Sequence, residues 1–220
     1  LNYFNLTRTF FIIRNTQKRL NEVLIMATNN EIEFKQILNE NVYHQIRNTY
    51  FENDKPFTQT NYYIDTNDFK LKKHQSALRI RVKDNQYEMT LKVPAKVGLT
   101  EYNHAINISP KIDTTISLSQ LPEDIRDIIE NQFGVSDKEL IILGALTTHR
   151  LETQFQNELL VLDQSEYLGK TDYELEFEVH SYDEGYEKFN HLLQEFNLSH
   201  EKPLNKVQRF FEEKQNSSKE

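Results

Sequence analysis

Residues 171–180 read TDYELEFEVH, and acidic and apolar side chains alternate without interruption from Glu174 onward. Side chains at positions i and i+2 of a strand point to the same face of a sheet. The stretch therefore predicts a strand with two unlike faces. Its acidic face carries Glu174, Glu176 and Glu178, and its apolar face carries Leu175, Phe177 and Val179. Such a strand is typical of a sheet that packs against other elements on one side only.

The same alternation appears at 77–83 (ALRIRVK) and 86–93 (QYEMTLKV), which flank an Asp-Asn turn. Arg79 and Arg81 share one face of the first of these strands. Further strand patterns occupy 31–38, 59–66, 99–108, 140–151 and 157–164. A solvated polar face is the simplest interpretation of any single strand. The charges nevertheless come in runs of one sign, which repel each other unless counter-charges lie between them.

Three segments, 40–51, 122–133 and 184–197, place apolar residues at helical spacing, and a short helix or strand follows Pro203. The apolar stripes of these helices need an apolar partner, and the apolar strand faces are the available surface. If the helices cover the outside, the charged faces point inward. The sequence therefore predicts one α+β domain with about eight strands, mostly antiparallel, and an eight-stranded sheet closed in this way has a polar lumen.

A lumen lined by charges is costly unless the charges pair with each other or hold a ligand. Lysine and arginine bind phosphate oxygens, and clustered carboxylates hold a hard cation such as magnesium. The chain contains no G-x-x-x-x-G-K-[ST] phosphate loop, so a P-loop enzyme is excluded. The interior predicted here instead suits a phosphate compound bound together with a metal ion.

Composition narrows the class of protein further. The 220 residues carry a formal net charge of −8, which argues against a nucleic-acid or anionic-membrane partner. The absence of cysteine excludes disulfides, cysteine zinc sites and thiol nucleophiles. The sequence contains no stretch of about 18 apolar residues, so no transmembrane helix is expected. A cytoplasmic location fits this composition.

The first 25 residues differ from the rest, because four basic residues there stand against the single acid Glu22. Met26 lies just before the first strand pattern. We interpret 1–25 as a mis-assigned upstream extension or a disordered arm, with a targeting segment as the rival interpretation. Residues 26–215 are expected to form one domain, and 216–220 a disordered tail.

An ordered set of motifs resembles the CYTH family, named for class IV adenylate cyclase and thiamine triphosphatase and also called triphosphate tunnel metalloenzymes. The set spans about 31–211, and its order is more specific than any one motif. It comprises Glu31-Ile32-Glu33-Phe34-Lys35, Tyr62-Tyr63-Ile64-Asp65-Thr66, Leu78-Arg79-Ile80-Arg81, Thr90-Leu91-Lys92, Arg150, Leu162-Asp163, Glu174-Leu175-Glu176 and Lys206. The chain is most similar to the Bacillota-type branch of that family.

The resemblance implies an α+β fold, namely an eight-stranded antiparallel closed β-barrel with helices packed on its outside, which forms a tunnel that holds a triphosphate lengthwise. Glu31, Glu33 and Glu176 would hold a Mg²⁺ or Mn²⁺ ion, and Asp163 and Glu174 a second ion that positions the attacking water. The phosphate contacts would be Lys35, Arg79, Arg81, Lys92, Arg150 and Lys206, with Glu101 as a further acidic tunnel residue. Of these, Lys35, Arg79, Arg81, Asp163 and Glu174 would be catalytic. Glu178 extends the last motif to E-x-E-x-E, so the register of its metal ligands stays open by one step.

The function implied by the resemblance is metal-dependent hydrolysis of the terminal phosphate of inorganic triphosphate or of a nucleoside or thiamine triphosphate. Catalysis of this reaction depends on positioning and charge stabilisation more than on a strong base. Two alternatives stay open, an adenylate cyclase on the same scaffold and a non-catalytic module that binds polyphosphate or nucleotide. The expected partner is a small-molecule triphosphate, with the chain acting as a monomer or homodimer.

Overall fold

One antiparallel sheet dominates the computed structural model, which describes residues 32–95 and 99–217. Its strands are β1 (Ile32–Leu38), β2 (Phe57–Asp65), β3 (Ala77–Lys83), β4 (Gln86–Pro94), β5 (Leu99–Ile106), β6 (Thr115–Ser117), β7 (Glu139–Phe155), β8 (Glu158–Tyr167) and β9 (Lys170–Val179). Eight of them follow the order β1-β9-β8-β7-β2-β3-β4-β5, and the short β6 pairs with β7. Every strand expected from the alternation is present, and the α+β class is confirmed.

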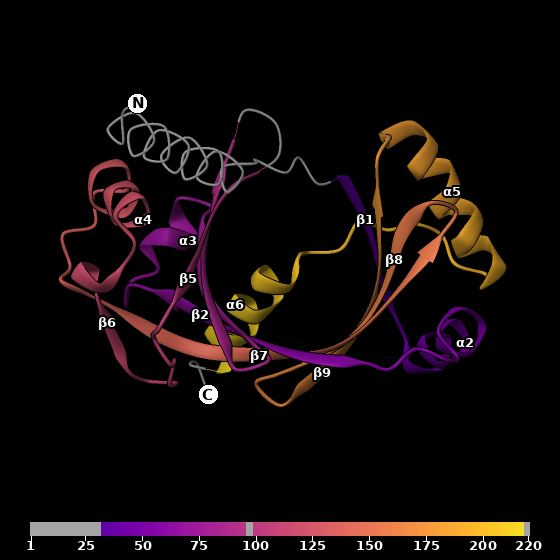
Figure 1. Cartoon of the computed structure of the whole chain (residues 1–220), viewed down its shortest axis with the longest axis horizontal. Coiled ribbons are helices and arrows are strands. Elements are labelled where there is room, and N and C mark those ends of the chain that lie inside the picture. The colour runs from indigo at the N-terminus through magenta and orange to yellow at the C-terminus, as the bar shows by residue number, and fades with distance from the viewer. Residues whose placement is uncertain (1–31, 96–98, 218–220) are drawn as a thin grey trace, which may run out of the picture.

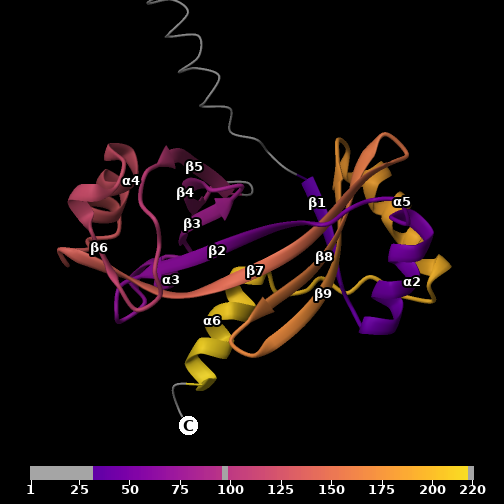
Figure 2. The same ribbon diagram turned by 60° about the horizontal axis from the view of Figure 1, so that its bottom comes forward.

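The sheet is strongly curved but open. Within the described residues its hydrogen-bonded path ends at β1 on one side and at β5 on the other, and Figure 1 shows these two strands on opposite sides of the curve. The expected closed barrel is therefore wrong for this structure. The cause lies in the 17-residue strand β7, which pairs with β2 over 141–150 but with β8 over 147–155. This stagger carries β3–β5 and β8–β9–β1 toward different ends of β7 (Figure 2).

Helices cover the outer, apolar face of the sheet at both ends. Helices α2 (Glu40–Tyr50) and α5 (Tyr182–Glu195) pack on β1, β8 and β9. At the other end, α3 (Lys70–Lys73), α4 (Glu123–Asp127) and a π-helical turn (Ile128–Gln132) pack on β3 and β4. The segment expected as one helix over 122–133 is thus two consecutive turns of different geometry. Two separate apolar cores result, one under each end of the sheet.

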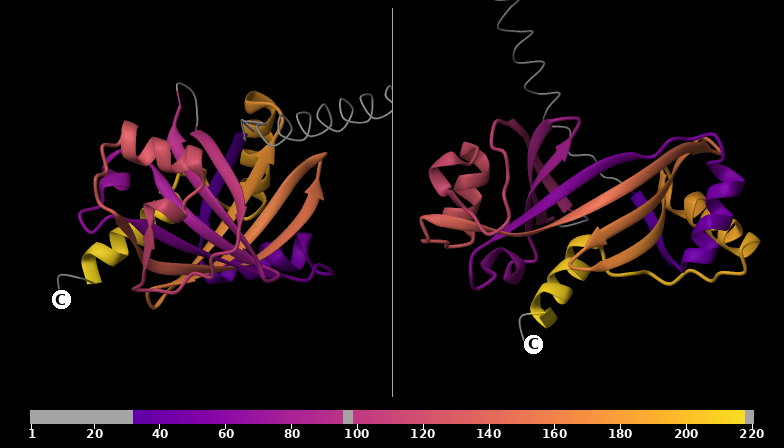
Figure 3. Two further views of the ribbon diagram at one scale, coloured as in Figure 1. Left: turned by 60° about the vertical axis from the view of Figure 1, so that its left-hand side comes forward. Right: turned by 90° about the horizontal axis from the view of Figure 1, so that it is seen from below.

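The last helix, α6 (Lys206–Ser217), takes a different position, which corrects the expectation that all helices lie outside. Phe210 and Phe211 pack against Tyr63 and Tyr167, whose strands β2 and β8 also carry the charged inner face. Figures 1 and 3 show α6 beside β7 and β9. Lys206 lies one helical turn from Phe210, so α6 presents cationic and aromatic side chains together. The inner face of the sheet offers partners for both, since Lys206 contacts acids of β8 and β9 there and Phe210 packs against Tyr63 and Tyr167.

α6 also reaches 217, so helical structure extends into the segment 216–220, whose residues 218–220 lie outside the described part of the chain. The interpretation of 1–25 concerns residues that likewise lie outside it.

Gly144 on β7 provides the space into which α6 packs. A Cβ atom at this position would lie 2.7 Å from Cζ of Phe210, closer than real carbon atoms approach. We expect Gly144→Ala to lower the free energy of unfolding by about 1–3 kcal/mol, the usual cost of overpacking. Urea denaturation measures this. Combining it with Phe210→Leu should cost less than the sum of the two single changes, because the shorter side chain leaves room. A fully stable Gly144→Ala protein would mean that α6 does not pack there.

Candidate active site

The acidic row of β9 is the centre of a group of charges on the inner face. Register places Lys35 of β1 opposite Glu176 and Glu33 opposite Glu178. On the other side of β9, Asp163 of β8 lies opposite Glu174. Opposed residues of an antiparallel pair project to the same face. Strand pairing therefore brings together residues that are up to 145 positions apart in the sequence.

Glu176 makes the largest number of these contacts. Its side chain is only 3% exposed, yet its carboxylate lies 3.2 Å from Lys35 Nζ and 2.8 Å from Arg150 Nη2, and it also contacts Lys206 Nζ. Burial alone raises the pKa of the Glu176 carboxyl, but Lys206, Lys35 and Arg150 outweigh burial and hold this pKa well below its usual range. Glu176 is therefore an anion surrounded by cations from three different elements.

Asp163 is equally enclosed. Nε and Nη2 of Arg150 donate to its two carboxylate oxygens at 2.8 and 2.7 Å, the forked geometry that guanidinium favours. Lys206 Nζ lies 2.8 Å from the same residue and contacts Glu174 and Glu176 as well. Burial lowers the pKa of Lys206, but the three carboxylates raise it above its ordinary value.

Glu174 differs from Glu176 in its electrostatics. Burial raises the pKa of the Glu174 carboxyl, and Lys206 offsets only part of this shift. A second cation, Arg209 of α6, donates from Nη1 to Oε2 of Glu174 at 2.8 Å. Burial lowers the pKa of Arg209, but Glu174 and Asp172 outweigh burial and raise it. The row of acids is thus neutralised almost entirely by side chains of the chain itself.

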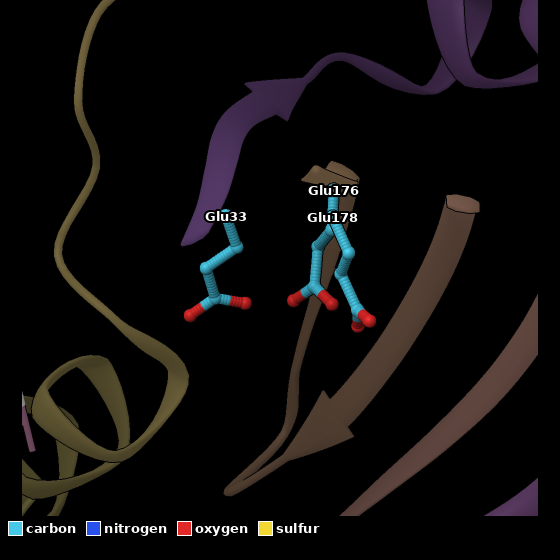
Figure 4. A group of neighbouring side chains, drawn as sticks. All are labelled: Glu33, Glu176 and Glu178. Carbon is cyan, nitrogen blue, oxygen red and sulfur yellow. The ribbon is translucent and has the colours of Figure 1, made fainter. Parts of the chain in front are cut away.

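Two sets of carboxylates are close enough to hold a metal ion. One is Glu33, Glu176 and Glu178, and the other is Asp163, Glu174 and Glu176; in each, one oxygen per residue lies within 4.8 Å of the others. Figure 4 shows the first set, with Glu33 from β1 facing the two glutamates of β9. Oxygen donors alone suit a hard cation such as Mg²⁺ or Mn²⁺. The acids present therefore fit a divalent metal.

Arg79, Arg81, Lys92 and Glu101 form a second group on the inner face of β3, β4 and β5. Lys92 and Glu101 lie opposite each other and form an ion pair. Within the described residues, neither arginine has a carboxylate at ion-pair distance. Arg81 Nε donates to Asn61 at 3.1 Å, whereas Nε of Arg79 is buried without a hydrogen-bond partner there. Burial, followed by repulsion from Arg79, lowers the pKa of Arg81 to about 10. This group has positive charge left over for an anion.

All the site residues that the sequence predicted and the structure describes lie on the inner face. Glu33 joins the first group through Lys35 at 3.0 Å. The structure does not bring the two groups into direct contact with each other. Glu31 lies outside the described residues. The prediction missed Arg209, although it follows Lys206 by one helical turn, and it left Glu178 unassigned, although the E-x-E-x-E run includes it.

The helices of the described residues are all too short or too polar to cross a membrane.

Comparison with known proteins places this arrangement in a family. The CYTH domain matches residues 29–211, which includes both charged groups. YjbK of Bacillus subtilis (strain 168), described as a candidate triphosphatase, is 37% identical over 193 residues, covering 87% of this chain and all of YjbK. The crystal structure of a candidate adenylate cyclase from Bacillus halodurans is 30% identical, with a TM-score of 0.64 over 82% of this chain and 97% of its own.

A candidate adenylyl cyclase from Hippeastrum with a dominant triphosphatase activity shares the fold at 22% identity, with a TM-score of 0.66 over 83% of this chain and 95% of its own. The family match and the relatives confirm the resemblance that the sequence indicated. The chain belongs to the CYTH domain family.

Proposed function

We propose that this chain hydrolyses the terminal phosphate of inorganic triphosphate or of an organic triphosphate, with Mg²⁺ or Mn²⁺ as cofactor. The observation that carries the proposal is the division of charge on one face. Carboxylates suited to a cation lie in the first group, and arginines without a carboxylate partner lie in the second. A triphosphate with its metal ion is a ligand that would supply a cation to exchange with the partners of the first group and the anion that the second group lacks. The candidate triphosphatase YjbK supports the same reaction class.

Each group has its own part in the proposed reaction. When bound, a divalent cation neutralises phosphate oxygens and polarises water. Glu33 and Glu176, with Glu31 by motif, would hold one ion, and Asp163 and Glu174 a second. Phosphate oxygens would be bound by Lys35, Arg79, Arg81, Lys92, Arg150 and Lys206. Glu101 would hold Lys92 in place, since the two form an ion pair. Fixed cations of this kind stabilise the charge that shifts along the phosphates as the terminal bridge breaks.

The cations of the first group would change partners on binding. Lys35 and Lys206 contact acids in this structure, whereas metal binding would occupy those acids and leave the ammonium groups to phosphate oxygens. The acids and bases would therefore stay paired until the metal ion binds the acids and the phosphate oxygens bind the bases. A general base is not required, because positioning and charge account for the chemistry.

Adenylate cyclase activity is the second candidate function, because the similar Bacillus halodurans protein is described as a candidate adenylate cyclase. A single assay separates the alternatives. Tripolyphosphate, ATP and thiamine triphosphate are incubated with the protein and Mg²⁺ or Mn²⁺, and both phosphate and cyclic AMP are measured. We expect phosphate release without cyclic AMP, and loss of that release in excess chelator. Cyclic AMP from ATP would support the cyclase instead, and tight binding without turnover would indicate a binding module. Turnover that persists in chelator would remove the metal from the proposal.

Arg81 provides the sharpest single-residue test, because it has no carboxylate partner to lose. Arg81→Ala should lower kcat/KM for tripolyphosphate by about 100-fold or more, as loss of a preorganised charge contact does. The melting temperature should change little, because relief of the repulsion from Arg79 offsets the lost attraction to Glu88 and the lost hydrogen bond to Asn61. Arg126→Ala on α4, which removes a surface cation 3.9 Å from Glu130, is the matched control and should retain activity. An active, folded Arg81→Ala protein would contradict the assigned phosphate contact.

A further inference from the structure

Arg209 connects α6 to two acids of β9 at once. Its Nε donates to Oδ2 of Asp172 and its Nη1 donates to Oε2 of Glu174, both at 2.8 Å. The side chain is 12% exposed, and Glu174 is 1% exposed. A guanidinium is rigid and planar, so two donors from one group fix both carboxylates in relation to each other. Lysine cannot reproduce this, because its ammonium is a single point of charge.

The two oxygens of Glu174 are bound by different cations. Lys206 contacts Oε1 and Arg209 contacts Oε2. Of these two cations, only Lys206 also contacts Asp163 and Glu176, the other members of this carboxylate set. Within the described residues, Arg209 makes no hydrogen bond or ion pair with those two acids. Lys206 therefore lies among the carboxylate oxygens that could bind a metal ion. Arg209 instead binds Glu174 on its opposite side, where it also contacts Asp172.

Asp172, the second acid that Arg209 binds, is itself held in place by a hydrogen bond. Tyr167 donates its hydroxyl to Oδ2 of Asp172 at 2.7 Å, the same oxygen that accepts from Arg209. Nη1 of Arg209 also donates to the backbone carbonyl of Leu204, whereas Nη2 is buried without a partner among the described residues. A buried donor without a partner costs about 1–3 kcal/mol, and such exceptions ask for a functional reason.

We propose that Arg209 is a positioning residue that orients Glu174 for metal binding, so that Glu174 keeps its place when Lys206 leaves it for a phosphate oxygen. This inference rests on the proposed function. It assigns different tasks to two cations one turn apart on α6: Lys206 exchanges its acid partners for substrate, and Arg209 does not. Residues that hold a metal ligand in place commonly change metal affinity by about 10–100-fold when they are lost.

The test measures binding of Mn²⁺ to the substrate-free protein by electron paramagnetic resonance, beside steady-state kinetics with tripolyphosphate. Arg209→Gln should weaken Mn²⁺ binding at least about tenfold. It should raise the metal concentration needed for half-maximal rate by a similar factor, while KM at saturating metal stays within about twofold. Lys206→Gln should do the opposite, raising KM and leaving Mn²⁺ binding unchanged or tighter, because a competing ammonium is gone.

Two further variants keep the result interpretable. Arg209→Lys retains the charge without the fork and should show a smaller loss of Mn²⁺ affinity, and it carries the test if Arg209→Gln does not fold. Glu213→Gln removes the contact between Lys170 and α6 without touching Glu174, so it should weaken helix docking but not Mn²⁺ binding. Thermal denaturation of each variant reports the loss of docking.

Three outcomes would overturn the inference. Unchanged Mn²⁺ affinity in folded Arg209 variants would leave Arg209 as a helix anchor only. An equal loss of affinity in Glu213→Gln would attribute the effect to docking of α6 in general. Wild-type protein that neither binds Mn²⁺ nor hydrolyses tripolyphosphate would overturn the proposed function and this inference with it, whereas an active wild type confines any failure to Arg209.

Discussion

The enclosure of the Glu176 carboxylate by Lys35, Arg150 and Lys206 is the interaction on which the inner face depends. These cations come from β1, β7 and α6, so one buried anion joins two strands and the last helix. Removing one of the three cations would leave the buried Glu176 carboxylate less compensated, which costs more than a surface pair is worth. The position of α6 on the inner face follows from the same requirement, since Lys206 and Arg209 find their acids only there.

The two ends of the sheet solve the problem of buried charge differently. Around Glu176, acids and bases neutralise each other within the protein. Around Arg81, burial and repulsion from Arg79 lower the arginine pKa, and Asn61 is its only side-chain hydrogen-bond partner in the described part of the chain. At the first end, the charged side chains could exchange their ion-pair partners when a ligand binds. At the second end, Arg81 and Arg79 could gain an anionic partner. The proposed ligand, a metal cation with several phosphate oxygens, would satisfy both ends together.

Much of this arrangement could be predicted from local pattern. Alternation in strands such as 77–83 and 171–180 determines which side chains share a face, and this property survives whatever the order of strands. The edges of the sheet could not be predicted in the same way. Whether β1 pairs with β5 depends on the stagger of β2 and β8 along β7, a non-local property that no single strand encodes. The family resemblance supplied a closed tunnel, and this structure departs from it at that point.

The position of α6 was missed for a related reason. The sequence pattern left the segment after Pro203 open between a short helix and a strand, so it could not show that Phe210, Phe211 and the neighbouring cations share one surface. Lys206 matched a motif, whereas Arg209 had only its helical spacing to mark it. Helical periodicity that counts charged and apolar residues together would have indicated a helix that needs a mixed surface.

The separation between core and site explains how one sheet can carry such a charged face. Both large apolar cores lie on the outer side, one under α2 and α5 and the other under α3 and α4. Burial of these cores supplies most of the favourable free energy of folding, so the fold does not rest on the inner face alone. Its ion pairs are free to be exchanged, and changes to a residue such as Arg81 act on ligand binding before they act on folding. Arg209 and Glu174 link the stability of the fold to the arrangement of the site. The reason is that α6 packs on the sheet through its aromatic residues and contacts Glu174 through Arg209.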